Sequence, residues 1–330
     1  MDLSVAADVG WQADIREGAA EQRMTNALRS QYCCGGKLSW AWALVALVIM
    51  CGAAVAKEPS SQDVSEGRRG VSQKIVSIGG DTTEILYALG LGDRIVAVDS
   101  TSLYPEVALK EKANIGYMRQ LTTEGVLSTG GTIVVASAGA GPPDVVRALK
   151  SSSVRYETLP GNETADNVAD KVRFLGKLFA VEAKAEPLAS EINRRFAALA
   201  EKRLGIEKPM RVLFVLGVGG SKAMIGGTGS TADMVLKLAG AENAASEVSG
   251  YKPLTDEALI SLAPDVIVTI RRAGAEDTDK YVAALPGFGA TPAGKSGRII
   301  SMDAHYLLGF GPRTPQAAEE LMASVYPGRR

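Results

Sequence analysis

The sequence predicts an α/β protein made of two similar lobes with mainly parallel sheets, joined by one long helix. Short β-branched runs such as Ile75–Ile78 and Val266–Ile270 alternate with helical segments along the chain, which is the pattern of parallel strands covered by helices. Residues 164–205 carry a helical pattern between the two halves. A short motif that begins at Gln120 returns 133 positions later, at Pro253. These three observations indicate two lobes and a helical connection.

The repeated motif has the same residue types in the same order in both halves. The matching pairs are Leu121 and Leu254, Thr122 and Thr255, Glu124 and Glu257, and Ser128 and Ser261. An apolar run follows each copy, which predicts a capped short helix and then a buried strand. The spacing is not the period of a solenoid, which is about 20–50 residues. We therefore favour duplicated lobes, each with one glutamate at the same place, over a chance match.

The start of the chain predicts a secretory signal. Lys37 precedes the apolar run Leu38–Met50, and small residues follow as far as Ala56. A basic flank, an apolar core and an A-x-A site are typical of signal peptides. The run is shorter than the roughly 20 residues of a membrane span, although an uncleaved anchor is the alternative. We expect residues 1–56 to be a signal peptide with a long leader, cut near Ala56, with Met24 as a possible true start.

Removing this segment changes the composition in two ways. All three cysteines (Cys33, Cys34 and Cys51) precede the expected cut, so the exported chain would have no disulfide. Four basic and five acidic residues are removed with it. The 36 basic and 37 acidic residues of the whole chain thereby become 32 of each. Nucleic-acid binders carry a basic excess, so a nucleic-acid partner is excluded.

The rest of the chain divides into four parts. Residues 57–73 are polar and predict a flexible tether, 74–163 an N-terminal α/β lobe, 164–205 the helical segment, and 206–330 a C-terminal α/β lobe. The expected strands are 74–78, 94–98, 132–136, 211–216, 265–270 and 298–302, and the expected helices of the second lobe are 231–239, 256–262 and 314–326. Asp81 is expected to cap the first helix, with Glu84 in its first turn, and Pro187 to lie in the first turn of a later helix.

Residue counts exclude several kinds of site. The only histidine is His305, whereas zinc and manganese carriers need several histidine or carboxylate ligands. No G-x-S-x-G motif accompanies it, which argues against a serine hydrolase. We expect a binding protein rather than an enzyme. We expect His305 to line the wall of a cleft or to be a polar residue whose hydrogen bonds are satisfied within the protein.

The glycine-rich stretch Gly227–Ala232 has the residue pattern of a dinucleotide-binding motif. It lacks the context of that motif, because the preceding strand ends too early. It is better interpreted as a helix N-terminus capped by Ser230 or Thr231. Such an end can attract an anionic ligand group, and a plain capped helix is the equally supported alternative.

The long loop 99–118 carries the most specific chemistry. Tyr104 precedes Pro105, which favours an extended backbone that can project the phenol. A tyrosinate oxygen is a hard ligand for ferric iron, and tyrosine can hold haem iron. Arg119 follows shortly after the loop and could support the phenolate or pair with a ligand carboxylate. A plain surface tyrosine is the alternative.

Four blocks of the chain resemble the periplasmic haem-binding proteins of bacterial haem ABC importers. They are the loop 99–119, the stretch Leu121–Leu127, Gly250–Leu259, and Met302–Pro315. The resemblance implies a class III periplasmic binding protein, in which two Rossmann-like lobes are bridged by a long helix and the ligand lies between them.

The resemblance also implies residue roles. Tyr104 would ligate the iron of ferric haem b, carried as cargo, and Tyr117, Met118 and Arg119 would line the cleft. Glu124 and Glu257 would dock onto arginines of the permease. From the second lobe we expect contacts by Tyr251, Lys252, Arg271 and Arg272. Some members add a histidine from the first lobe for a second haem, but none exists here, so we expect one haem.

The partners implied are the permease and ATPase complex of the inner membrane and, indirectly, an outer-membrane haem receptor. The protein itself is expected to be a monomer in the periplasm. Three alternatives remain at this point: the same fold with a ferric siderophore or corrinoid, an exported α/β enzyme that uses Gly227–Ala232, and a membrane-anchored structural protein.

Overall fold

The N-terminal lobe is built on a five-stranded parallel sheet. The computed structural model describes residues 73–161, 165–219, 222–271 and 278–328, all within one compact unit, Ser61–Arg330. The strand order is β3-β2-β1-β4-β5, and every pairing is parallel. The strands are β1 (Ile75–Ile78), β2 (Ile95–Val98), β3 (Ala113–Asn114), β4 (Ile133–Ala136) and β5 (Arg155–Thr158).

Helices cover both faces of this sheet. Ile75, Ile133 and Val135 pack against apolar residues of α3 (Gly80–Ala88), α7 (Ala165–Leu178) and α8 (Glu182–Leu204). The alternate residues Val76 and Val134 pack against α5 (Thr123–Leu127) and α6 (Pro143–Lys150). Successive strand residues point to opposite faces, so central strands buried on both faces become continuous β-branched runs.

The C-terminal lobe has a six-stranded sheet of mixed direction. Its path is β11-β10-β6-β7-β9, with β8 also paired to β6. The pairs of β6 with β7 and of β7 with β9 are antiparallel, and the other pairs are parallel. The strands are β6 (Arg211–Gly219), β7 (Lys222–Gly226), β8 (Glu242–Asn243), β9 (Tyr251–Pro253), β10 (Val266–Arg271) and β11 (Ile299–Asp303).

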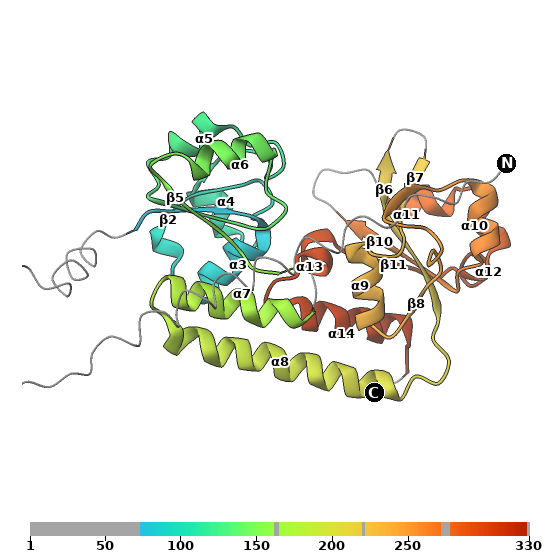
Figure 1. Ribbon diagram of the computed structural model, residues 1–330. Coiled ribbons are helices and arrows are strands. Elements are labelled where there is room, and N and C mark those ends of the chain that lie inside the picture. The colour runs from blue at the N-terminus through green and yellow to red at the C-terminus, as the bar shows by residue number, and fades with distance from the viewer. Residues whose placement is uncertain (1–72, 162–164, 220–221, 272–277, 329–330) are drawn as a thin grey trace, which may run out of the picture. The chain divides into compact units, whose positions relative to one another are not determined.

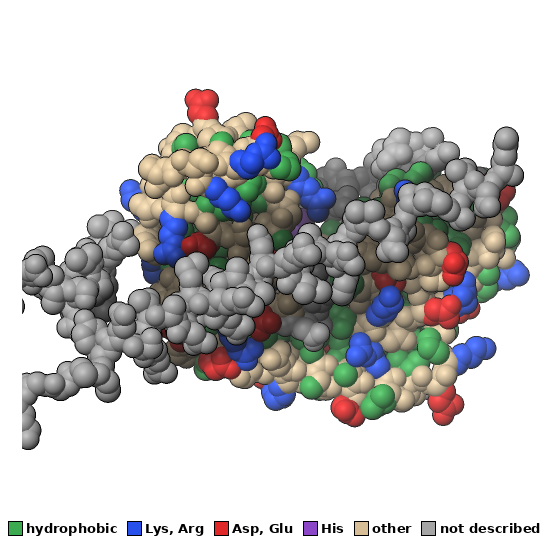
Figure 2. Space-filling model, viewed as in Figure 1, with side chains coloured by type: hydrophobic (Ala, Val, Ile, Leu, Met, Phe, Trp, Pro, Cys, Tyr) green, Lys and Arg blue, Asp and Glu red, His purple; other side chains and the backbone are tan. Residues whose placement is uncertain are grey.

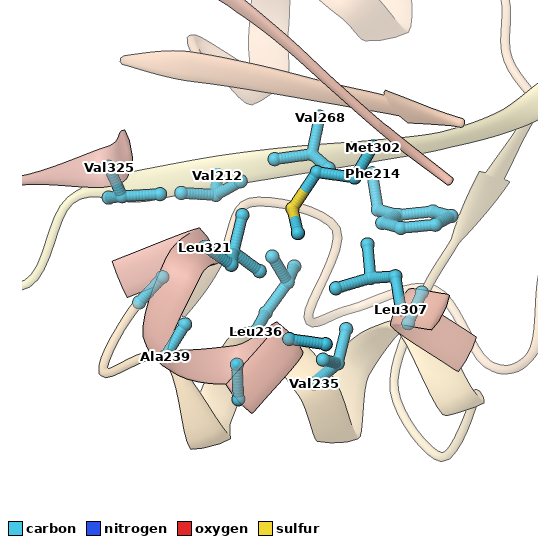
Figure 3. Close-up of a cluster of buried hydrophobic side chains, with 14 of the residues drawn as sticks. Val212, Phe214, Val235, Leu236, Ala239, Val268, Met302, Leu307, Leu321 and Val325 are labelled. Atoms are coloured by element: carbon cyan, nitrogen blue, oxygen red, sulfur yellow. The ribbon is translucent and has the colours of Figure 1, made fainter. Parts of the chain in front are cut away.

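One face of this second sheet packs against helices in a large apolar core. Phe214 and Val268 of the sheet face Leu236 of α9 (Thr231–Leu238) and Leu321 of α14 (Thr314–Val325), as Figure 3 shows. The remaining helical elements are α4 (Val107–Glu111), α10 (Asp256–Leu262), α11 (Thr278–Ala283), α12 (Pro292–Ser296) and α13 (Ala304–Leu308), with short 3-10 turns at Gly92–Arg94 and Phe288–Ala290.

Helix α8 joins the two lobes. Its Ala185, Ala189 and Ile192 belong to the N-terminal core, whereas Leu199 belongs to the core of the C-terminal lobe. Figure 1 shows this helix running beside α7 at one end and α14 at the other. The expected fold class, two α/β lobes joined by one long helix, is therefore confirmed.

Several local expectations were wrong. Helix α3 begins at Gly80 after Gly79, so Asp81 is not its cap. Pro187 is the sixth residue of α8, because that helix begins at Glu182. The loop 99–118 contains α4 and β3, and α6, β5, β7, β8 and β9 were not expected. Strands β8 and β9 have only two and three residues, β7 pairs antiparallel, and the edge strand β5 has no buried residue. Such strands leave weaker signals in the sequence than buried parallel strands do.

The surface carries both charge signs. In Figure 2, acidic and basic side chains are interspersed along the edge where α8 lies. Among the described residues, no helix is long and apolar enough to span a membrane. The apolar run 38–50, the whole expected signal peptide and the expected tether as far as residue 72 lie outside the described residues.

Candidate ligand-binding site

A cavity of about 310 Å³ lies between the two lobes. Its lining from the N-terminal lobe includes Asp81, Thr101, Tyr117, Met118, Arg119 and Ser137. The lining from the C-terminal lobe includes Leu216, Thr231, Tyr251, Ala304, His305 and Leu308. The volume is at the lower end of the roughly 300–1,000 Å³ of small-molecule sites.

The topology explains why these residues meet. Gly80, Thr101 and Ser137 closely follow the carboxyl ends of β1, β2 and β4, three neighbouring parallel strands. Ligand sites of open parallel sheets lie beyond these ends. The cavity therefore occupies the position that the fold favours.

A buried carboxylate holds the loop that leads to Tyr104. Asp99 is fully buried, and its Oδ1 accepts hydrogen bonds from Gly79 N (2.7 Å) and Ser102 Oγ (3.0 Å). Its Oδ2 accepts from Thr101 N (2.9 Å) and Thr101 Oγ1 (2.6 Å). Four hydrogen bonds to one buried carboxylate fix the turn 99–102, which directly precedes Leu103 and Tyr104.

A second buried network lies at the cavity wall. Asp81 pairs with Lys171 of α7 at 2.7 Å, and both side chains are buried. Asp81 also accepts hydrogen bonds from Thr82 N and Ser137 Oγ. The aspartate expected to cap α3 instead neutralises a lysine 90 positions away.

Tyr104 does not line this cavity, although Thr101 of the same loop does. The Tyr104 ring lies under an arginine of the other lobe. Its side chain is 45% exposed, and the guanidinium carbon of Arg313 is 3.5 Å from its ring centroid. Arg313 is held by Glu84 of α3, whose Oε2 is 2.9 Å from Nη2 and whose Oε1 accepts from the Arg313 backbone N–H at 3.1 Å. A cation over an aromatic face is attracted by the ring quadrupole.

Tyrosines also shape the second lobe's side of the site. The Tyr251 hydroxyl is 2.7 Å from Thr231 Oγ1 and accepts from Ala232 N at 3.3 Å, at the first turn of α9. Ser230 caps that helix by accepting from Asp233 N. The expected helix N-terminus at this stretch, with Ser230 as its cap, is therefore confirmed. Tyr306, next to His305, has a pKa raised above its ordinary value by burial and by its hydrogen bond to Glu320.

The structure brings only some of the expected residues together. Tyr117, Met118, Arg119, Tyr251 and His305 line the cavity. Lys252 and Arg271 are exposed and absent from its lining, and Arg271 donates to Ser301 O. Arg272 lies outside the described residues. Glu124 and Glu257 are exposed on the short helices α5 and α10.

Sequence reasoning missed the two residues that contact one another beside Tyr104. Arg313 lies in the block Met302–Pro315 that carried the resemblance, but Glu84 was assigned to a capping role. In the described part of the chain, no group of three or more histidine, cysteine or carboxylate side chains could hold a bare metal ion.

A model of the periplasmic binding protein family matches residues 75–306. The chain belongs to this family. This periplasmic binding protein is similar to solved structures of haem-binding proteins. One is RhuT from Roseiflexus sp. RS-1, with 34% identity, coverage of 79% of this chain and all of that one, and a TM-score of 0.73. Another is BhuT in complex with two haems, with 36% identity, coverage of 77% and 97%, and a TM-score of 0.72.

Sequence relatives include transport proteins with other or unassigned ligands. The substrate-binding lipoprotein YvrC of an ABC transporter from Bacillus subtilis is 29% identical, over 82% of this chain and 84% of its own. A vitamin B12-binding protein from Vibrio parahaemolyticus is 25% identical, over 76% and 88%. This periplasmic binding protein is therefore a substrate-binding protein of an ABC transporter, in a family of transport proteins rather than enzymes.

Proposed function

We propose that this protein binds one ferric haem in the periplasm through the Tyr104 phenolate and delivers it to the inner-membrane permease of a haem importer. The observation that supports the proposal is the exposed Tyr104, on a loop that is anchored by Asp99 and whose Thr101 lines the inter-lobe cavity. The haem-binding names of the relatives at 34% and 36% identity support the same ligand.

The surroundings of Tyr104 suit an anionic oxygen ligand. Arg313 places a positive charge against the ring. Arg119, in the cavity lining, is the proposed partner of a haem propionate. Apolar lining residues such as Leu216, Leu308 and Met118 would cover the porphyrin, at about 25 cal/mol per Å² of apolar area buried.

Titration of the purified protein with haemin tests this proposal. We expect the spectrum of high-spin ferric haem with a tyrosinate ligand in the parent protein and in Tyr117→Phe. Tyr104→Phe keeps the ring under Arg313 but removes the ligand oxygen, so the tyrosinate band should be lost. A Tyr104→Phe spectrum identical to the parent's would exclude Tyr104 as the ligand.

The alternative ligand is a corrinoid or ferric siderophore. The vitamin B12-binding relative is the observation that favours it. Equilibrium binding of cyanocobalamin and haemin, measured in parallel, separates the two: a preference for cyanocobalamin would replace haem as the cargo.

Glu124 and Glu257 are proposed to dock the protein onto arginines of the permease. Both are exposed, and each follows a capping threonine, Thr122 or Thr255, on a short helix of its own lobe. The two lobes thus present one carboxylate each in the same local setting. Such a pair suits a partner with two similar halves.

Each of these helices also exposes one large aliphatic side chain. Leu127 is 41% exposed and Ile260 is 48% exposed, and they occupy equivalent positions of the repeat. Each lies three residues after the glutamate, and so on the same side of its helix. We include both in the proposed docking surface, as the apolar contacts beside the charged ones.

A further inference from the structure

Exposed apolar side chains gather on two loops of the N-terminal lobe, 99–105 and 114–119. Three of the six large apolar or aromatic side chains that are exposed in the described part of the chain lie there. They are Leu103, Tyr104 and Tyr117, which are 39%, 45% and 43% exposed. The other three lie on three separate helices: Leu127 on α5, Leu204 on α8 and Ile260 on α10. Single exposed apolar side chains are ordinary, whereas a group of them marks a contact surface.

The two loops lie side by side and meet at the wall of the inter-lobe cavity. Ser100 N donates a hydrogen bond to Gly116 O at 2.8 Å. Thr101 Oγ1 donates to the sulfur of Met118 at 3.8 Å. Thr101 and Met118 both line the cavity. The surface of the loops is therefore continuous with the cavity wall.

This surface carries no charge. Residues 100–105 and 113–118 contain no charged side chain. Tyr117 lines the cavity, whereas Leu103 and Tyr104 lie outside its lining. An apolar molecule can cover uncharged side chains without the cost of removing water from an ion. The surface thus extends the apolar part of the site beyond the cavity itself.

Both loops are held in place by their own hydrogen bonds. The carboxylate of Asp99 fixes the turn that precedes Leu103. In the second loop, Gly116 N donates to Asn114 Oδ1 at 2.9 Å, and Gly116 has a φ of 89°, which favours glycine. A surface that is already ordered loses little conformational entropy when a ligand binds.

The opposite wall of the cavity has less apolar area left to cover. Leu216 and Leu308 line it from the C-terminal lobe, but both are partly buried against the core of that lobe. Ala304 is buried. Burial of exposed apolar area is what stabilises an apolar contact, so the larger contribution comes from the loops of the N-terminal lobe.

We propose that this surface recognises the porphyrin ring itself, independently of iron, with Leu103 and Tyr117 against one face of the macrocycle. Leu103 is then a specificity-determining residue, and iron-free porphyrins are a second class of ligand for the same site. A cavity of about 310 Å³ is at the lower end of ligand sites, so part of so large a ligand lies on the loops. The inference rests on the proposed haem-binding function, which places a porphyrin at this site.

Fluorescence titration with protoporphyrin IX, which contains no iron, tests the inference beside the haemin titration. We expect the parent protein to bind it, and Leu103→Ser to weaken the binding of both porphyrins by about threefold to tenfold, the factor for partial loss of one buried aliphatic side chain. Tyr104→Phe should weaken the binding of haemin only, because the iron-free ring has no iron–oxygen bond to lose. Leu204→Ser is the matched control, since Leu204 is an exposed leucine of α8, and it should bind both porphyrins like the parent.

The outcomes separate this inference from the function on which it rests. If the parent binds haemin with a tyrosinate spectrum but does not bind protoporphyrin IX, iron is required and the inference is wrong, although the proposed function stands. If folded Leu103→Ser binds both porphyrins like Leu204→Ser, Leu103 does not contact the ring and its assignment is overturned. An unchanged haemin spectrum in Tyr104→Phe would instead reject the proposed iron ligand, and the protoporphyrin titrations would still decide the inference.

Discussion

Glu124 and Glu257 occupy the same position in two copies of one local structure. Each is the second residue of a short helix, α5 or α10, that starts after a threonine cap. The threonine hydroxyls accept from Gly125 N at 3.1 Å and Ala258 N at 3.2 Å. A buried leucine, Leu121 or Leu254, precedes each cap. The sequence repeat is therefore also a structural repeat, one copy in each lobe.

Charge reversal at either glutamate should separate docking from haem binding. We expect Glu124→Lys and Glu257→Lys each to weaken binding to the permease–ATPase complex in nanodiscs by about tenfold or more, because like charges would then meet. Haem spectra and unfolding curves should stay like the parent's, since both side chains are exposed. Glu201→Lys, on the exposed face of α8, is the control for net charge. Undiminished uptake with both reversals combined would rule out these two residues as docking contacts.

The paired aliphatic side chains provide an independent test of the same surface. We expect Leu127→Ser and Ile260→Ser each to weaken permease binding about threefold to tenfold, the factor for partial loss of one buried aliphatic side chain. The free energy of unfolding should change by no more than about 0.5 kcal/mol, as for other exposed positions. Leu204→Ser is the matched control, because Leu204 is 79% exposed on α8. Equal binding by all three variants would confine docking to the charged residues.

What the sequence could predict here was local, and what it missed depends on distant partners. Thr122 and Thr255 were identifiable as caps because their partners lie three residues away. The positions of the buried strands along the chain followed from apolar runs such as Ile133–Ala136. Asp81 and Glu84 had equally good local roles at a helix start, yet they pair with Lys171 and Arg313. Nothing in the local sequence indicates an ion pair across 90 or 229 positions.

Some of the residues expected to line the cavity do so and others do not, because the local sequence does not show which side chains meet. Tyr117, Met118 and Arg119 line it, and they were named from a contiguous block. Lys252 and Arg271 were expected in the cleft because they neighbour the second repeat and its strand. In a strand, however, neighbouring side chains point to opposite faces, and Tyr251 of β9 lines the cavity whereas Lys252 does not. Proximity in sequence identified the right strand but not the right face.

Loss of the Asp99 carboxylate should destabilise the fold and the Tyr104 loop together. Asp99→Ala leaves Gly79 N, Thr101 and Ser102 without their buried acceptor. We expect a loss of about 3 kcal/mol in the free energy of unfolding, measured by urea denaturation, and weaker haem binding at temperatures where the variant is folded. Asp303→Ala is the comparison, because Asp303 caps α13 from an exposed position and should cost only about 1 kcal/mol. Equal losses in the two variants would mean that the Asp99 network does not hold the loop.

Asp233 should make stability depend on pH near the start of α9, where Thr231 lines the cavity. Burial acts to raise the Asp233 pKa, but hydrogen bonds from Lys237, Asn243 and Gly229 N outweigh it and hold the pKa below its ordinary value of 3.8. A carboxylate with a depressed pKa stabilises the folded state above the unfolded-state value, and this contribution is lost as the pH falls through the folded value. At pH 7, Asp233→Asn should therefore have a free energy of unfolding, measured by urea denaturation, about 1–2 kcal/mol lower than that of the parent. This difference should shrink below about pH 4. Asp144→Asn, at an exposed position of α6, controls for the removal of one negative charge. A difference between parent and Asp233→Asn that stays constant down to acid pH would show that the carboxylate charge does not stabilise this helix start.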